Sequence, residues 1–477
     1  MKTLLHALLP ITLIVSSQLS ANSEKLSPYE YIGYKQQKVD AQIGTFTVPE
    51  NRNNPNSRQL TLTYVKFPTT SKTPGKPIVY LSGGPGGSAT GTAKRSRFEL
   101  FMKLRAASDV ILFDQRGTGL SNDLKSCQSS AIDLKVPSNE KKLIEKTLSD
   151  VKKCVVQWQS QNIDLDGYNT KQNAADLVDL TKALNTDKIN LWGISYGSHL
   201  AFAAAKYHPE IINQMALASI EGLDHTIKQP ARVQALIEKI SLMLKANPKT
   251  KDKYPHFIAD LAHVLQHLEK SPKIVNTQDF RTKKSLVVGI GKVDMQFALS
   301  FIFLTDPQYL MQLPRIITDM KNNQFAEIAS YIAYMRGMSA EHTLMSLAMD
   351  AASGISKQRW SQVQQQAKTA LVGRTTNFPF PDINAVMPVT DLGDDFRQAL
   401  HSDIPTLFVS GTLDGRTLYQ SQVELAANFS NANMITVEGG GHNIFMAHPD
   451  ISERILEFFN GQKVQSHTIT LDPIKFQ

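Results

Sequence analysis

The chain has 477 residues, which is too long for one simple core and predicts one large domain with an insertion, or two domains. Hydrophobic residues make up 42% and charged residues 20%, an ordinary globular composition that argues against disorder. The formal net charge is +8, but the basic residues are scattered and form no stripe interleaved with aromatic residues. They indicate a solvated surface and no nucleic-acid partner. The sequence has no zinc-type or dinucleotide-binding motif, so we expect no metal and no organic cofactor.

The first 21 residues are typical of a secretory signal peptide. Lys2 precedes an apolar run over residues 4–15, and a short segment of small and polar residues follows, with cleavage expected after Ala21. The apolar run is too short to cross a membrane and is interrupted by Pro10. No cysteine follows it, which argues against a lipid anchor. The sequence therefore predicts an exported protein, periplasmic or secreted, without a membrane span.

Apolar patterns predict the start of a sheet. Residues 45–49 and 60–65 alternate between apolar and polar side chains around an Asn-Asn-Pro-Asn turn, which predicts an antiparallel hairpin. Residues 78–81 and 110–113 are continuous apolar runs, and a loop rich in glycine follows each of them. Such runs are typical of parallel strands that are covered on both faces.

Cys127 and Cys154 are the two cysteines of the chain. In an exported protein, two thiols in one segment favour a disulfide over a metal pair, and two buried free thiols are the alternative. Neither cysteine has a glycine turn or a nearby histidine around it, so neither is expected to be a nucleophile.

The stretch around Ser195 has the pattern of a strand that turns sharply into a helix. A helix predicted over residues 170–184 leads to the apolar run 189–192, which is followed by Gly-Ile-Ser-Tyr-Gly and then by small residues with a helical pattern. The glycines two positions on either side of the serine leave room for the close turn. This context favours Ser195 as a nucleophile, with the backbone N–H of Tyr196 aimed at the substrate, over a chance Gly-x-Ser-x-Gly.

The alternation of strands and helices stops after a strand predicted over residues 215–218. Residues 224–390 carry apolar residues mostly at helical spacing, with helices expected over 307–335 and 341–352 among others. We interpret this segment as a helical insertion over the carboxyl edge of the sheet, which would form a lid on the active site.

The α/β pattern resumes with strands over residues 406–409 and 434–437 and closes with a helix over 451–459. The predicted fold is therefore a doubly wound, mostly parallel sheet with an inserted, mostly helical cap. The expected parts are a signal peptide (1–21), the first part of the core (22–223), the cap (224–390) and the second part of the core (391–477).

Two residues late in the chain can complete a catalytic triad with Ser195. A serine nucleophile needs a base oriented by a carboxylate, and doubly wound hydrolases place acid and then histidine after later strands. Asp414 follows one such strand, although an Asp-Gly pair can also be a simple turn. His442 follows the next strand behind three glycines, and of the twelve histidines it is the one in such a loop. The order Ser195, Asp414, His442 predicts the triad.

The glycine run after residues 78–81 can supply the second donor of an oxyanion hole. The backbone N–H of Tyr196 is the first donor and that of Gly84 the second, with Gly83 beside the substrate, because no Cβ blocks its approach. A phosphate-cradling loop is the alternative interpretation, but the run lacks the Gly-Lys-Ser/Thr ending of such loops.

Three motifs resemble those of α/β-hydrolase peptidases of the proline iminopeptidase family. They are Gly-Gly-Pro-Gly-Gly at 83–87, Asp-Gln-Arg-Gly-Thr-Gly at 114–119 and Gly-Ile-Ser-Tyr-Gly at 193–197. Exported, longer members, the tripeptidyl aminopeptidases, are more similar still in their signal peptide, cysteine pair and large cap. The resemblance implies an α/β-hydrolase fold, in which the first motif forms part of the oxyanion hole and the second supports the floor of the site.

The resemblance also implies release of residues from free peptide N-termini, with acidic residues that hold the substrate ammonium. Glu221, after the strand over 215–218, is the best candidate for this role, with Asp224 and Asp350 behind it. A solvated or salt-bridged carboxylate is the alternative interpretation of each. Ser82 stands where many members have a histidine.

The sequence thus predicts an exported serine aminopeptidase whose partner is a peptide with a free N-terminus. Ser195 would attack the carbonyl while His442 takes its proton, Asp414 would hold the imidazole, and water would hydrolyse the acyl-enzyme. A carboxylesterase or lipase with the same triad is the first alternative, because fold and triad are shared. A non-catalytic binding protein on this fold is the second. A haloalkane or epoxide hydrolase is excluded, because those reactions need a carboxylate at position 195.

Overall fold

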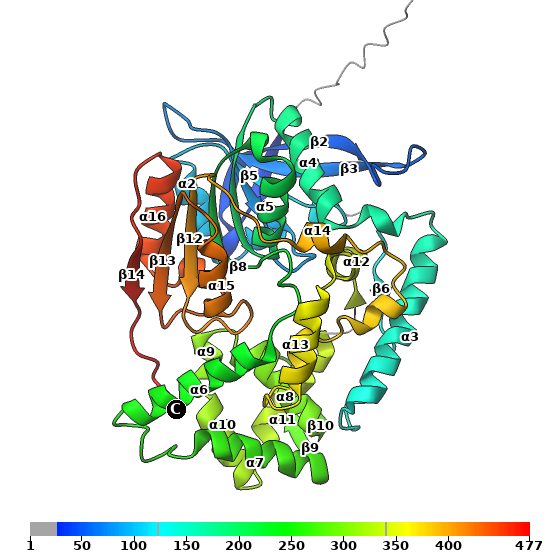
Figure 1. The fold of residues 1–477 in the computed structure, drawn as a ribbon, viewed down its shortest axis with the longest axis vertical. Coiled ribbons are helices and arrows are strands. Elements are labelled where there is room, and N and C mark those ends of the chain that lie inside the picture. The colour runs from blue at the N-terminus through cyan, green and yellow to red at the C-terminus, as the bar shows by residue number, and fades with distance from the viewer. Residues whose placement is uncertain (1–25, 122–123, 339–340) are drawn as a thin grey trace, which may run out of the picture.

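The computed structural model describes residues 26–121, 124–338 and 341–477, so the predicted signal peptide lies outside the described residues. A ten-stranded sheet organises the molecule (Figure 1). In spatial order its strands are β1 (Ser27–Ile32), β2 (Lys38–Pro49), β3 (Gln59–Phe67), β5 (Val110–Phe113), β4 (Ile78–Leu81), β7 (Ile189–Ser195), β8 (Ile212–Ile220), β12 (Thr406–Gly411), β13 (Ala432–Glu438) and β14 (His467–Thr470).

The sheet is antiparallel at one edge and parallel through the rest. β1, β2 and β3 form antiparallel pairs, and β3 pairs antiparallel with β5. From β5 to β14 every neighbouring pair is parallel. The predicted hairpin is confirmed as β2 and β3, with Thr45 opposite Thr63. The runs 78–81 and 110–113 are confirmed as fully buried parallel strands, as expected for strands covered on both faces.

Helices cover both faces of the sheet (Figure 1). On one face, α2 (Phe98–Leu104) and α16 (Pro449–Phe459) pack on Trp192 and its neighbours. On the other face, α3 (Glu140–Gln159), α4 (Thr170–Ala183) and α5 (Tyr196–Tyr207) build a second cluster of buried residues. The short helices α1 (Ala89–Thr92), α14 (Gly393–Arg397) and α15 (Tyr419–Ala426) complete this part. This arrangement is the doubly wound sheet that the sequence predicts.

The cap, which we define as residues 224–390, has a hydrophobic core largely of its own. Its helices are α6 (Pro230–Ala246), α7 (Phe257–Lys270), α8 (Lys292–Ala298), the π-helix η5 (Leu299–Phe303), α9 (Pro307–Leu310), α10 (Leu313–Lys321), α11 (Ala326–Met338), α12 (Leu344–Ser353) and α13 (Lys357–Ala367). An antiparallel hairpin, β9 (Lys273–Gln278) and β10 (Ser285–Ile290), lies between α7 and α8.

Two helices expected in the cap differ from the prediction. The stretch 307–335 is broken into α9, α10 and α11, because Pro314 starts a new helix and residues 322–325 leave the helical path. The stretch 341–352 begins with a two-residue strand, β11 (Glu341–His342), and only then becomes α12. Thr343 caps that helix by accepting a hydrogen bond from the backbone N–H of Ser346, which fixes its start.

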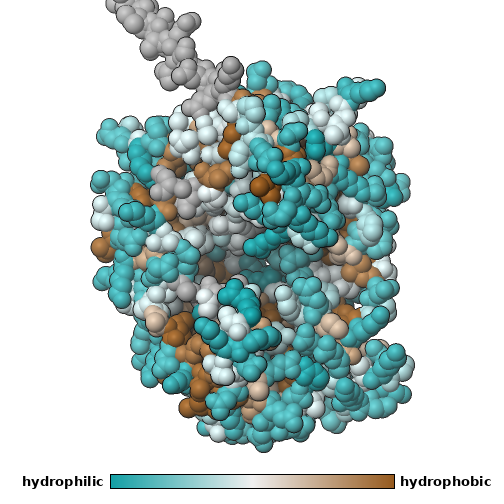
Figure 2. Space-filling view, turned by 180° about the vertical axis from the view of Figure 1, so that it is seen from behind, coloured by the Kyte–Doolittle hydropathy of each residue, from teal (hydrophilic) through white to brown (hydrophobic). Residues whose placement is uncertain are grey.

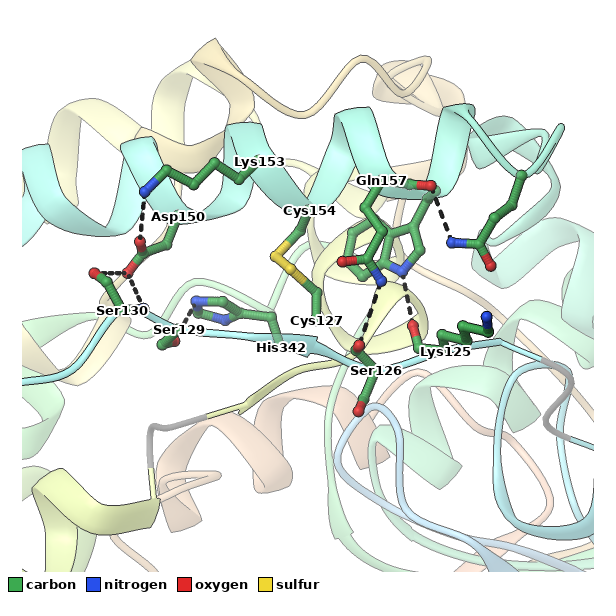
Figure 3. The surroundings of a disulfide bond; sticks show 12 residues. Lys125, Ser126, Cys127, Ser129, Ser130, Asp150, Lys153, Cys154, Gln157 and His342 are labelled. Carbon is green, nitrogen blue, oxygen red and sulfur yellow. Dashed lines mark hydrogen bonds and ion pairs between the residues drawn. A yellow bond between two sulfur atoms is a disulfide. The ribbon is translucent and has the colours of Figure 1, made fainter.

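A disulfide joins Cys127 and Cys154, as the sequence favours, with their Cα atoms 5.5 Å apart (Figure 3). Cys127 lies on β6 (Cys127–Gln128), and Cys154 on α3. β6 pairs with β11, so that Cys127 stands opposite His342. The disulfide therefore links α3 to β6, whose partner strand β11 leads into α12 of the cap.

The end of the chain runs from the sheet to the cap. After β14, the side chains of Ile474 and Phe476 pack against the hydrophobic core of the cap. The hydroxyl of Tyr254 donates a hydrogen bond to the carbonyl of Gln477, whose N–H donates to the carbonyl of Met311 at 3.0 Å. The C-terminus accordingly lies beside α6 in Figure 1.

Seen from behind, the surface is mostly hydrophilic, with hydrophobic residues scattered over it in small groups (Figure 2). In the described parts of the chain, each helix is too short or too polar to cross a membrane.

Candidate active site

Ser195 occupies the corner between β7 and α5. Its backbone angles are φ 55° and ψ −128°. Residues other than glycine rarely adopt this conformation, because it costs free energy. The corner is tight, because a Cβ on Gly197 would lie 2.1 Å from the carbonyl oxygen of Leu81. The strand, the strained serine and the helix thus have the geometry that the motif predicts.

Asp414 and His442 are in direct contact. The Nδ1 atom of His442 lies 3.1 Å and 3.0 Å from the two carboxylate oxygens of Asp414. Asp414 follows β12, is buried, and also accepts hydrogen bonds from the backbone N–H and hydroxyl of Thr417 at 2.9 Å and 2.7 Å. Burial by itself would raise the pKa of Asp414, but His442 and Thr417 together hold it below its ordinary value. The carboxylate is therefore kept ionised beside the imidazole.

The loop of His442 is held by the cap as well as by the sheet. The backbone N–H of His442 donates to the carbonyl of Thr305 at 2.9 Å, and Ser219 at the end of β8 donates to the carbonyl of His442 at 2.8 Å. Asp306 accepts from the backbone and side-chain nitrogens of Asn443 at 2.9 Å and 2.7 Å. Nothing in the local sequence around Thr305 and Asp306 signals this role, because it depends on residues more than 130 positions later.

A cavity of about 270 Å³ brings the predicted residues together. Ser195 and His442 both line it, and Asp414 lies behind His442. The lining residues are Ser82, Gly83, Gly84, Arg97, Ile194, Ser195, Glu221, Lys228, Arg416, Thr417, His442 and Asn443. Segments from distant parts of the sequence thus converge at the carboxyl ends of β4, β7, β8, β12 and β13.

The glycine loop after β4 lies directly on the nucleophile corner. A Cβ on Gly83 would lie 3.2 Å from the Cβ of Ser195, so that a larger residue would crowd the site. The carbonyl of Ser82 accepts a hydrogen bond from the side chain of Gln115 at 3.1 Å, and Asn173 of α4 donates to Gln115 at 2.7 Å. These buried contacts fix the loop that carries Gly83 and Gly84.

The N–H of Tyr196 belongs to the first turn of α5, where the backbone donors have no acceptor within the helix. It is therefore available to an oxygen that Ser195 attacks. The phenol of Tyr196 points away from this role: it is fully buried, and its hydroxyl lies 3.2 Å from that of Thr170 and 3.0 Å from the sulfur of Met349.

The Asp-Gln-Arg-Gly segment after β5 makes its contacts in the interior. Asp114 accepts hydrogen bonds from the backbone N–H of Thr90 at 3.0 Å and of Leu120 at 2.8 Å. Arg116 is fully buried and forms a two-pronged ion pair with Asp176 of α4, at 2.7 Å and 2.6 Å. Together with Gln115, these residues join the strand ends below the cavity.

The three acidic residues predicted to hold an ammonium have different surroundings. Glu221 is buried, lines the cavity and forms an ion pair with Lys228 at 3.1 Å. Asp224 does not line the cavity: its carboxylate accepts hydrogen bonds from the N–H and hydroxyl of Ser356 at 2.8 Å and 2.6 Å. Burial, and then the charge of Glu221, raises the pKa of Asp350 to about 8. Of the three, Glu221 is thus the one in the cavity.

Three cationic side chains also line the cavity, and the sequence analysis missed all of them: Arg97, Lys228 and Arg416. Arg416 lies two residues after Asp414, and this position was the one available signal.

The described ranges contain no group of three or more histidine, cysteine or acidic side chains that could hold a metal ion.

Comparison with known proteins gives two family matches. Residues 76–264 match the family described as the alpha/beta hydrolase fold. Residues 385–468 match the family described as TAP-like protein.

Individual relatives are similar at low identity. YuaR of Escherichia coli (strain K12) is 22% identical over 468 residues, which are 91% of this chain and 88% of YuaR. The tripeptidyl aminopeptidase of Streptomyces coelicolor is 28% identical over 193 residues, 38% of this chain and 35% of that protein. The proline iminopeptidase of Xylella fastidiosa is 30% identical over 146 residues, 31% of this chain and 33% of that protein. The chain thus spans about a third of the length of these two peptidases.

The two family matches cover the whole candidate site. The first includes the glycine loop, Ser195 and Glu221, and the second includes Asp414, Arg416 and His442. Together with the mostly parallel sheet, these matches show that the chain has the α/β-hydrolase fold, and parts of its sequence are similar to proline iminopeptidases and tripeptidyl aminopeptidases.

Proposed function

We propose that the protein is a serine hydrolase that releases residues or short peptides from free peptide N-termini. The observation that carries this proposal is the contact of His442 with the buried carboxylate of Asp414, in a cavity that Ser195 also lines. A carboxylate at Nδ1 fixes the tautomer in which Nε2 is free to accept a proton. An imidazole so oriented is what a serine hydroxyl needs to become a nucleophile.

The reaction has two stages. Ser195 attacks the carbonyl of the substrate while His442 takes the hydroxyl proton, and the N–H groups of Tyr196 and Gly84 stabilise the oxyanion. His442 then gives its proton to the leaving amine, which departs. Water, deprotonated by His442, attacks the acyl-enzyme and restores Ser195. Asp414 stabilises the imidazolium that forms in both stages.

The names of the related tripeptidyl aminopeptidase and proline iminopeptidase support peptides as the substrates. Glu221 is the acidic residue of the cavity and would hold the substrate ammonium, in part by exchanging it for Lys228. A predicted signal peptide and a disulfide support export, since disulfides persist in oxidising compartments.

A fluorophosphonate probe tests the serine chemistry. The native protein should be labelled, and Ser195→Ala should lose the label completely. Ser160→Ala is the matched control, because this exposed serine at the end of α3 donates its hydroxyl proton to the carbonyl of Gln157, far along the chain from the site, and the label of this variant should persist. Asp414→Asn should lower kcat by about four orders of magnitude, because the amide favours the wrong tautomer. A native protein that is not labelled would favour the non-catalytic alternative.

Blocked substrates test the peptidase activity. Hydrolysis of aminoacyl arylamides should be lost when the α-amino group is acetylated. Glu221→Gln should raise KM for substrates with a free amine, because the carboxylate that holds the ammonium is gone. Equal rates on free and acetylated substrates, with faster hydrolysis of the matching aryl esters, would favour the carboxylesterase alternative.

A further inference from the structure

The cavity beside Ser195 contains more positive than negative groups. Arg97, Lys228 and Arg416 line it, and Glu221 is the acidic residue among the lining side chains. Glu221 is paired with Lys228 at 3.1 Å. Within the described residues, neither Arg97 nor Arg416 has a carboxylate at salt-bridge distance. Two guanidinium groups are therefore left for a partner that the chain does not supply.

Arg416 makes few of the hydrogen bonds that a guanidinium can make. Its Nη1 atom donates to the carbonyl of Ser300 at 3.4 Å, and its guanidinium carbon lies 4.5 Å above the centre of the Phe301 ring. Both contacts come from η5 of the cap, so they hold the side chain over the cavity without neutralising it. Burial lowers the pKa of Arg416, although Glu221, Asp414 and Asp350 act against this effect. A desolvated guanidinium is costly unless an anion pairs with it.

Arg97 adds to the same excess. It stacks on the rings of Tyr80 and Phe445, at 5.8 Å and 5.3 Å, and donates a hydrogen bond to the hydroxyl of Tyr80. Its Nε atom is buried and has no hydrogen-bond partner. An unpartnered buried donor in the lining of a cavity indicates a ligand with acceptor oxygens.

The acidic groups nearby do not cancel this charge. Asp414 does not line the cavity, because it lies behind His442, whose Nδ1 atom is 3.0 Å from its carboxylate. With a pKa of about 8, Asp350 is mostly uncharged at neutral pH. Lys228 in turn neutralises Glu221. The charge left in the cavity at neutral pH is therefore positive.

We propose that Arg416 binds a carboxylate of the substrate, on a residue next to the scissile bond, and so makes the enzyme selective for peptides that carry a carboxylate there. The inference rests on the proposed function, because Ser195 defines where the scissile bond lies. A guanidinium can bind a carboxylate with two parallel hydrogen bonds, a geometry that the ammonium of Lys228 cannot reproduce. With about 270 Å³, the cavity is small, so the carboxylate belongs to a residue on one side of the bond or the other.

The carboxylate can come from two sources. It is either the side chain of an aspartate or glutamate that donates the scissile carbonyl, or the C-terminal carboxylate of a single leaving residue. Two substrate pairs separate them. The first compares the α-arylamides of glutamate and glutamine, and the second compares Ala-Ala with Ala-Ala amide. In one of the pairs, kcat/KM should be about tenfold to hundredfold higher for the acidic member, the range expected for one charge-assisted hydrogen-bonded pair.

Variants then assign this preference to Arg416. In Arg416→Gln, the ratio of kcat/KM between the acidic and the neutral member of the preferred pair should fall close to one. Arg416→Lys keeps the charge but not the two-pronged geometry, and should retain a reduced ratio. Arg454→Gln is the matched control: it removes the same charge from an exposed arginine on α16, paired with Glu457, and should leave the ratio unchanged.

Labelling by the fluorophosphonate probe separates the two proposals. A native protein that is labelled but has ratios near one in both pairs overturns the carboxylate site alone. A ratio that survives both Arg416→Gln and Arg416→Lys, in variants that are still labelled, also overturns it. Where Arg416→Gln is not labelled, Arg416→Lys decides. A native protein that is never labelled overturns the proposed function, and the carboxylate site with it.

Discussion

Among single residues, Asp350 makes the stability of the protein depend on pH. Its pKa rises from 3.8 to about 8 on folding, through burial first and then the charge of Glu221. The folded state therefore binds a proton that the unfolded state has already lost between these two values. By linkage, the stabilising contribution of the protonated carboxyl is complete below about pH 4 and is lost as the pH rises towards 8.

Asp350→Asn should remove this dependence, because the amide is neutral throughout. We expect the variant to gain stability relative to the native protein by about 1.4 kcal/mol for each pH unit within this interval. Urea unfolding at pH 5, 6.5 and 8 measures the difference. Asp252→Asn, which changes an exposed aspartate between α6 and α7, should give a difference that does not vary with pH. A constant difference for Asp350→Asn as well would contradict the burial of its charge.

Between elements, the ion pair of Arg116 with Asp176 fixes the end of β5 to α4. Both side chains are fully buried, and Arg52 shares Asp176 at 2.7 Å. Breaking such a pair leaves a buried charge without compensation. Asp176→Asn should therefore lower the free energy of unfolding by about 3–5 kcal/mol. Urea unfolding measures this, and Glu145→Gln, on an exposed pair with Lys141, should change it by less than about 0.5 kcal/mol. Equal effects of the two substitutions would rule out the structural role of the buried pair.

The elements that the sequence predicted are those with a strong local pattern. The runs that became β4 and β5 are apolar throughout, the run that became β7 contains one polar residue, Asn190, before the Gly-Ile-Ser corner, and the hairpin of β2 and β3 alternates around a turn rich in asparagine. The hairpin of β9 and β10 escaped prediction, because the half-buried residues of β9 are Lys273, Val275 and Thr277, which show no apolar alternation. β11 is too short to have a period at all, since it is defined only by its pairing with β6.

The site residues that the sequence predicted likewise have a strong local pattern, and those that it missed do not. Ser195 ends a strand at a Gly-x-Ser-x-Gly corner, and Asp414 and His442 each follow a later strand in a glycine-containing loop, so order and local context were enough to nominate the three as a triad, which stays a prediction. The position of Arg416 over the cavity depends on Phe301, 115 residues earlier in the chain, and nothing in its own segment encodes this contact. Asp224 ranked behind Glu221 in the sequence as a candidate to hold an ammonium, and in the structure Ser356 binds its carboxylate.

For the molecule as a whole, the last residues join the cap to the sheet. Ile474→Ala combined with Phe476→Ala removes the apolar side chains that pack on the cap and should destabilise it by about 1–3 kcal/mol. Limited proteolysis should then cut faster within α6 and α7. The exposed Lys475→Ala lies between these positions and should leave the cleavage rate unchanged. Unchanged cleavage in the double variant would show that the cap stands without the tail.

The attachment at the C-terminus bears on how a substrate enters. Two stretches of chain, after β8 and before β12, connect the cap to neighbouring strands of the sheet. Two connections so close together would by themselves allow the cap to rotate about a hinge. The tail is a third fastening, and it leaves from β14, two strands away from β12. A domain that is also attached away from its hinge cannot rotate freely as one body. The three attachments therefore oppose a rotation of the whole cap, and in the proposed reaction peptides would reach Ser195 through small shifts of individual loops.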